Sequence, residues 1–142
     1  MNDTTDIARI IRPANTAAVR LQFIRARTCY GHLAGEVAVK VLAAMLQARW
    51  LAAKGRDFEI TALGQQQLAA LGVDVAGALR SRRLHARACL DLTQRRPHLS
   101  GALGDALLDC FVARGWVQRQ PRSRAVRITR KGQAGFRRGF GI

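Results

Sequence analysis

A repeat within the chain constrains its fold more than any other feature. The segment HLAGEVAVKVLAAMLQARWL, which starts at His32, recurs from His98 as HLSGALGDALLDCFVARGWV. In each copy a Trp, Trp50 or Trp116, follows the His after the same number of residues. A polar stretch, an Ile-Thr pair and a Gly then come in the same order. Because a repeat this short holds one small structural unit, we expect the chain to contain two copies of that unit.

Each copy of the repeat predicts a helix, a hairpin and a second helix. Apolar residues recur at helical spacing at Leu33, Val37, Val41 and Met45, and again at Leu99, Leu103, Leu107 and Phe111. Beyond each Trp, apolar and polar residues alternate around residues 54–57 and 120–123, which predicts two hairpins. Thr61 and Thr129 are placed to cap the helices that follow. The predicted fold class is therefore mainly α with two small β-hairpins, as tandem winged-helix-like repeats about an approximate two-fold axis.

Four parts follow from this pattern. They are an N-terminal segment and helix (1–30), a first winged-helix-like repeat (31–73), a linking helix and loop (74–97) and a second winged-helix-like repeat (98–142). Asp74 is the expected cap of the linking helix and Asn15 that of the N-terminal helix. Residues 1–13 are expected to be weakly ordered.

The charge of the chain points to a polyanionic partner. Lys and Arg number 24 against 9 Asp and Glu, a net charge of +15, and the net charge is +3 before residue 79 and +12 from there on. Arginines that we expect to contact duplex DNA lie in the second predicted hairpin (Arg119, Arg122, Arg124 and Arg127) and along the linking segment (Arg80, Arg82, Arg83 and Arg87). A solvated charged face is the alternative. Since no ladder of aromatic residues accompanies the arginines, duplex contact is favoured over single-strand stacking.

Two motifs carry a family resemblance. The stretches RTCYGHLAG (Arg27–Gly35) and CLDLTQRRPHLSGALG (Cys89–Gly104) resemble the C-terminal half of a subgroup of ArsR-family helix-turn-helix transcriptional regulators. The similarity covers about residues 20–135. It implies a DNA-binding regulator of transcription, and a homodimer is expected because such regulators meet symmetric operators. The family's N-terminal DNA-reading winged helix is expected to be absent, and a separate DNA-reading protein would then be a partner.

The same motifs hold candidate ligands for a metal or a small molecule. Cys29 and His32 form one group, and Cys89, Asp91 and His98 form another. Thiolate, imidazole and carboxylate suit zinc or another soft divalent metal. The alternative is that each His-Leu-x-Gly begins a helix, with its imidazole bonded to a nearby carbonyl, because the cysteines precede the two histidines by different distances. Cys110, on an apolar stripe, is expected in the core, as are Trp50 and Trp116.

Other classes of protein have little support. No G-x-S-x-G, P-loop or G-x-G-x-x-G motif and no paired carboxylates are present, so we do not expect an enzyme. No apolar stretch is long enough to span a bilayer, and the N-terminus lacks the pattern of a signal peptide. Three cysteines cannot all pair, so reduced thiols and a cytoplasmic location are expected. The rival function is an effector-sensing or partner-binding module of a regulator that does not itself bind DNA.

Overall fold

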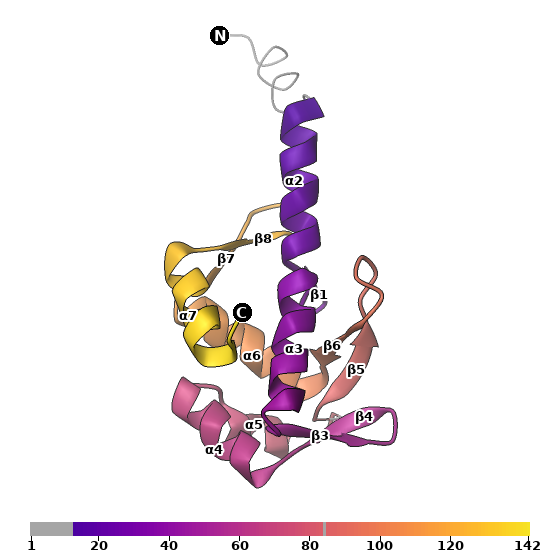
Figure 1. The fold of residues 1–142 in the computed structure, drawn as a ribbon, viewed down its shortest axis with the longest axis vertical. Helices are drawn as coiled ribbons and strands as arrows, with labels where there is room; N and C mark the ends of the chain where they lie inside the picture. The colour runs from indigo at the N-terminus through magenta and orange to yellow at the C-terminus, as the bar shows by residue number, and fades with distance from the viewer. Residues whose placement is uncertain (1–12, 84) are drawn as a thin grey trace.

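The two halves of the chain have the same order of elements: a hairpin, a helix, a second hairpin and a second helix (Figure 1). The computed structural model describes residues 13–83 and 85–142. The helices in this part of the chain are α2 (Pro13–Arg25), α3 (Glu36–Gln47), α4 (Ala62–Leu71), α5 (Val75–Arg80), α6 (Gly101–Ala113) and α7 (Arg130–Phe140). The strands are β1 (Arg27–Cys29), β2 (His32–Ala34), β3 (Leu51–Lys54), β4 (Asp57–Ile60), β5 (Arg87–Leu90), β6 (Pro97–Ser100), β7 (Val117–Arg119) and β8 (Val126–Ile128).

The strands pair as four antiparallel hairpins in sequence order, β1–β2, β3–β4, β5–β6 and β7–β8. The hairpins β3–β4 and β7–β8 are the two that the sequence predicts. The other two correct the expected fold class, because the structure is a mixture of helices and small hairpins. The first three residues of each His-Leu-x-Gly lie in a strand, β2 or β6, and the Gly lies where the next helix begins, as the N-cap of α3 or the first residue of α6. Leu33 and Leu99 are buried as predicted, but they point inward from strands that are only three or four residues long.

Equivalent contacts fix the start of the last helix in each half, α4 or α7. The hydroxyls of Thr61 and Thr129 accept hydrogen bonds from the backbone N–H groups of Gly64 and Gly132, as the sequence predicts for helix caps. Both glycines pack so closely on the carbonyl of the preceding Trp, Trp50 or Trp116, that an added Cβ would collide with it. This explains why Thr-x-x-Gly recurs at this distance from each Trp.

The segments before and between the halves differ in part from expectation. Asp74 caps α5 by accepting from the Gly77 N–H, as predicted. The N-terminal helix α2 begins at Pro13, so Asn15 lies inside the helix and is not its cap. The weak order expected for residues 1–13 concerns, apart from Pro13 at the start of α2, residues outside the described part of the chain. The linking helix ends at Arg80, and the arginines at positions 82, 83 and 87 therefore lie beyond it, the last of them in β5.

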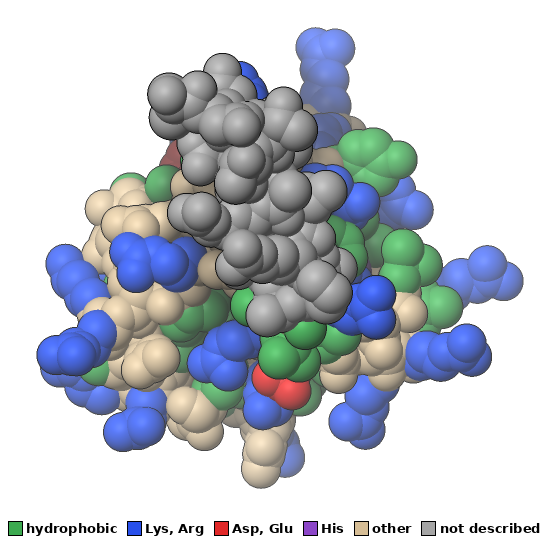
Figure 2. Space-filling view, turned by 90° about the horizontal axis from the view of Figure 1, so that it is seen from above, with side chains coloured by type: hydrophobic (Ala, Val, Ile, Leu, Met, Phe, Trp, Pro, Cys, Tyr) green, Lys and Arg blue, Asp and Glu red, His purple; other side chains and the backbone are tan. Residues whose placement is uncertain are grey.

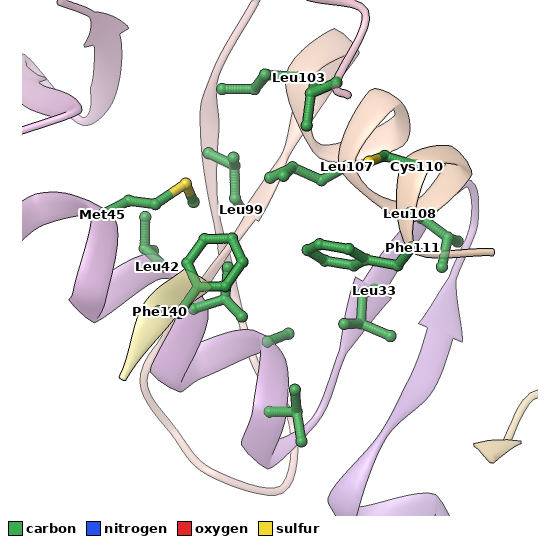
Figure 3. Close-up of a cluster of buried hydrophobic side chains, with 14 of the residues drawn as sticks. Leu33, Leu42, Met45, Leu99, Leu103, Leu107, Leu108, Cys110, Phe111 and Phe140 are labelled. Carbon is green, nitrogen blue, oxygen red and sulfur yellow. The ribbon is translucent and has the colours of Figure 1, made fainter. Parts of the chain in front are cut away.

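The core is shared by the two halves. Strand β2 packs against α6, and β6 packs against α3, so each half places its first hairpin on the helix of the other. Figure 3 shows the apolar side chains of α3 and α6 meeting there, with Phe140 of α7 among them. Phe111 stacks on Trp116 with ring centroids 5.4 Å apart. Cys110 is buried, as predicted, and Trp116 is buried while Trp50 is half-buried.

Among the described residues, no helix is long and apolar enough to cross a membrane.

Candidate functional site

The hairpins β1–β2 and β5–β6 bring together side chains that the sequence places in two separate groups. Cys29 and His32 come from the first hairpin, and Cys89 and His98 come from the second. One ligand atom from each of the four side chains lies within 4.8 Å of all the others. We call these four residues the Cys-His cluster. Both histidines are buried, and both cysteines are partly exposed.

Strand register makes the two Cys-His pairs equivalent. Cys29 stands opposite His32 in β1–β2, and Cys89 stands opposite His98 in β5–β6. The first hairpin turns through two residues, 30 and 31, whereas the second has a loop at 91–96. The longer loop, with one more strand pair, Leu90–Pro97, before it, accounts for the greater distance between Cys89 and His98 in the sequence. The different spacing of the cysteines, which spoke against a shared site, therefore reflects loop length and not position.

The two imidazoles face each other at the centre of the cluster. Nε2 of His32 lies 3.0 Å from Nε2 of His98, and Nδ1 of His98 lies 2.9 Å from Oδ1 of Asp91. Because an ionised carboxylate can only accept, His98 donates from Nδ1 and keeps a lone pair on Nε2. The alternative raised by the sequence was a bond from each imidazole to a nearby carbonyl. The structure instead has a chain of hydrogen bonds from Asp91 through His98 to His32.

Asp91 is the hydrogen-bonding hub behind the cluster. Its side chain is 0% exposed. It accepts from the backbone N–H of Gly35 at 2.7 Å and of Gln94 at 3.0 Å, from the Thr93 hydroxyl at 3.0 Å, and from the Arg27 guanidinium at 3.3 Å. Burial alone would raise the pKa of Asp91, but these hydrogen bonds and the charge of Arg27 outweigh it and lower the pKa to about 2. The carboxylate is therefore ionised at all physiological pH values.

Burial also sets the protonation of the cluster itself. Burial, together with the neighbouring imidazole of His98, lowers the pKa of His32 to about 4. Burial lowers the pKa of His98 too, against the opposing attraction of Asp91. Burial and the nearby Cys29 raise the pKa of the Cys89 thiol. At neutral pH the imidazoles are thus neutral and offer lone pairs, while Cys89 holds a proton that a bound cation would have to displace.

A pocket of about 470 Å³ opens beside the cluster. Its wall includes His32 and Cys89, and its other lining residues include Tyr30, Arg83 and Arg87. Arg83 forms an ion pair with Asp105 of α6. The pocket gives a small ion or molecule a path to the cluster.

The arginines that the sequence proposes for DNA contact lie in two places. Arg119, Arg122, Arg124 and Arg127 are all exposed on β7–β8 and its turn. Arg80, Arg82, Arg83 and Arg87 are exposed near α5 and β5, which lie away from β7–β8 (Figure 1). Two of the β7–β8 arginines have partners within the chain: Nε of Arg124 donates to the Thr28 carbonyl at 3.1 Å, and Nε of Arg127 donates to the Gln118 side chain at 3.0 Å.

Helix α7 adds basic residues that were not predicted as DNA contacts from the sequence. Its apolar side is buried through Phe136 and Phe140, and its exposed side carries four cations. These are Arg130, Lys131, Arg137 and Arg138. From residue 110 to the C-terminus the sequence contains no Asp or Glu. In Figure 2, Lys and Arg side chains project around most of the outline of the visible face, where acidic side chains are scarce. The helical spacing of Phe136 and Phe140, with pairs of basic residues at 130–131 and 137–138, was the available signal.

Arg27 also belongs to the site but was not predicted to, although it is the first residue of the motif RTCYGHLAG. Arg27 is 2% exposed, and its guanidinium bonds to Asp91, to the Phe23 carbonyl and to the Thr93 hydroxyl. In a chain with 24 Lys and Arg residues, nothing in the sequence indicates that this arginine is buried. Only its contact with a carboxylate 64 residues away distinguishes it.

Comparisons with known proteins give one informative relation. No model of a protein family matches the chain, and no solved structure matches it. Over 117 residues the chain is 38% identical to a protein of Bacillus subtilis (strain 168) named "Uncharacterized HTH-type transcriptional regulator YdfF". The matched segment is 82% of this chain and 52% of that protein, so the chain spans about half the length of the relative. This similarity supports a relation between the chain and the transcription regulators.

Proposed function

We propose that the chain is an ArsR-like, winged-helix-type regulator of transcription that contacts duplex DNA through the unit β7–β8–α7. The observation that carries the proposal is the contrast between this unit and its counterpart in the first half, β3–β4–α4. Both units have the same order of elements and the same helix cap. They differ in charge, and this difference is what a polyanion would recognise.

The counterpart unit is close to neutral. Its hairpin carries Lys54 and Arg56 against Asp57 and Glu59, and α4 has no charged residue. The unit β7–β8–α7 has arginines on both elements and no acidic residue. Among the described residues, none of its cations takes part in an ion pair. Charge that served only solubility could be spread over both units. Its concentration in β7–β8–α7 therefore supports a specific polyanionic partner for that unit.

Two of the arginines of the hairpin β7–β8, which we call the second wing, are the best first contacts. Arg119 and Arg122 are exposed, and neither is among the side-chain donors in the described hydrogen bonds. Arg124 instead holds the wing to the first half, because its guanidinium bonds to Thr28 and lies over the ring of Phe23. The wing is therefore fixed in place while its outer arginines remain available to phosphate oxygens or to a narrow minor groove.

Binding to a labelled duplex, followed as salt is raised, tests the proposal. We expect affinity in the micromolar range or tighter, with a steep log-linear loss as salt increases. Replacing Arg119 and Arg122 by Gln should weaken binding and reduce the slope of that plot by about 2, because each lost phosphate contact removes roughly 0.9. The matched control replaces Lys54 and Arg56 by Gln in the equivalent hairpin and should leave both quantities unchanged. Equal losses in the two variants would contradict a specific role for the second wing.

The second candidate is an effector-sensing or partner-binding module that works with a separate DNA-reading protein. The burial of α3 and α6 favours it, since the helix before each wing faces the core and is not free to enter a groove. Absence of duplex binding at low salt would make this the preferred function. A homodimer on a symmetric operator belongs to the first candidate, and sedimentation with and without duplex tests it.

A further inference from the structure

We propose that the Cys-His cluster binds one soft or borderline divalent metal ion, zinc in the first instance, which joins the two halves of the chain. The ligands are Sγ of Cys29 and Cys89 and Nε2 of His32 and His98. Two thiolates and two imidazoles form a donor set that zinc accepts as a closed, four-coordinate site. The inference does not depend on whether the chain contacts DNA.

The separations within the cluster suit a tetrahedral ion. With Zn–N bonds of about 2.0 to 2.1 Å and Zn–S bonds of about 2.3 Å, neighbouring ligand atoms lie roughly 3.3 to 3.8 Å apart. The two Nε2 atoms of the cluster are 3.0 Å apart, and all four ligand atoms lie within 4.8 Å of one another. Side-chain movements of about 1 Å therefore complete the coordination geometry.

The surroundings of His98 are those of a metal ligand. A metal-binding imidazole usually donates its second ring N–H to a carboxylate, which fixes the tautomer and the direction of the lone pair. Nδ1 of His98 has this partner in Asp91, which is itself held by Gly35, Gln94 and Arg27. The carboxylate thus aims Nε2 of His98 at the centre of the cluster.

A hydrogen-bonded pair of histidines is the competing explanation. It accounts for the contact between the two Nε2 atoms, but it leaves unexplained why a Cys stands opposite each His in the strand register. Equivalent hairpins from the two halves supply one Cys and one His each, so the metal would sit where the two halves meet. Since all four ligands come from the protein, the ion would be structural or regulatory and not catalytic.

Titration of the full, reduced chain with Co²⁺ tests the inference without any variant. Tetrahedral coordination by two thiolates gives strong visible d–d bands and a near-ultraviolet thiolate-to-cobalt charge-transfer band. We expect both signals to saturate at one ion per chain and to be lost when Zn²⁺ is added. Weak bands typical of six-coordinate cobalt, without charge transfer, would overturn the proposal.

Variants then identify the ligands. Zn²⁺ affinity, measured by competition with a chromophoric chelator, should fall by more than about a hundredfold in Cys29→Ala or Cys89→Ala. This loss exceeds the roughly 10- to 100-fold expected for Asp91→Asn, which removes only the hydrogen-bond partner of His98. The matched controls are Cys110→Ala and His85→Gln, which alter the remaining Cys and His and should bind as the parent does. Circular dichroism confirms that each variant is folded. If the folded double variant Cys29→Ala, Cys89→Ala still bound one zinc ion with parental affinity, the site would be refuted. An equal loss of zinc affinity in the two controls would refute it as well.

Discussion

Asp91 connects the two halves of the chain through one carboxylate. Its oxygens accept from Gly35 and Arg27 in the first half and from Thr93, Gln94 and His98 in the second. Breaking a buried ion pair by removing one partner typically costs about 3 to 5 kcal/mol, because the other charge stays buried and unpaired. In this chain the stranded charge would be Arg27, which is 2% exposed.

The pH dependence of unfolding should report this carboxylate. In the metal-free chain the pKa of Asp91 is about 2, against 3.8 for the unfolded chain. A lowered folded-state pKa stabilises the fold above the unfolded value, and the contribution is lost as pH falls through the folded value. We expect Asp91 to contribute about 2 kcal/mol above pH 5 that disappears between about pH 4 and pH 2. Urea unfolding of the parent and of Asp91→Asn across this range measures it, and a difference between them that stayed constant with pH would contradict the assignment.

At the scale of elements, short strands were the hardest feature to predict. Helix α3, helix α6 and the hairpins after each Trp follow from apolar spacing and turn residues. The hairpins β1–β2 and β5–β6 were missed because Leu33 and Leu99 fit the spacing of the following helices. In a strand of three or four residues, alternation contains too few positions to outweigh a helical pattern next to it.

Because the hairpins β1–β2 and β5–β6 were missed, the sequence did not predict that the two groups of candidate ligands form one site. Cys29, His32, Cys89, Asp91 and His98 were all candidate ligands from the sequence, but as two groups. Their meeting depends on strand register and on the reciprocal packing of β2 on α6 and β6 on α3, which no local pattern encodes. The basic second half was predictable from composition, whereas the separation of its arginines into different surfaces was not.

The packing of α7 on the second hairpin makes a matched pair of glycine variants informative. An added Cβ at Gly132 would collide with the Trp116 carbonyl, while at Gly139 it would meet only ordinary contacts with the Trp116 ring and Leu71. We expect Gly132→Ala to destabilise the fold by roughly 2 kcal/mol or more. Gly139→Ala should stabilise it by about 0.5 to 1 kcal/mol, because Ala favours the helix. Thermal unfolding of the two variants measures both effects. Equal effects would mean that α7 does not pack as described.

At the scale of the whole molecule, the cluster and the basic unit are mechanically linked. Strand β1 carries Cys29 and Arg27, and its backbone also pairs with the second wing, where the Thr28 N–H donates to the Arg124 carbonyl at 2.7 Å. An ion held between β1–β2 and β5–β6 would therefore stiffen the strand on which the wing rests. Under the proposed function, this contact would connect a bound ion to the basic unit β7–β8–α7.

Metal removal should lower the stability of the whole fold and not only of the two hairpins. At a free zinc concentration 1,000 times the dissociation constant, binding stabilises the folded state by about 4 kcal/mol. For a chain of this length that corresponds to a Tm shift of roughly 10 °C. A chelator should produce this loss in the parent and in Cys110→Ala, and no change in the variant that lacks Cys29 and Cys89. A parental Tm that is indifferent to chelation would show that the two halves are held together without metal.

X-ray absorption at the zinc edge of the reduced, zinc-loaded full chain measures the atoms that bind the ion. We predict that two sulfur atoms at about 2.3 Å and two imidazole nitrogens at about 2.0 to 2.1 Å surround the zinc. A shell of nitrogen and oxygen atoms alone, with no sulfur, would contradict a metal site built from both halves of the chain.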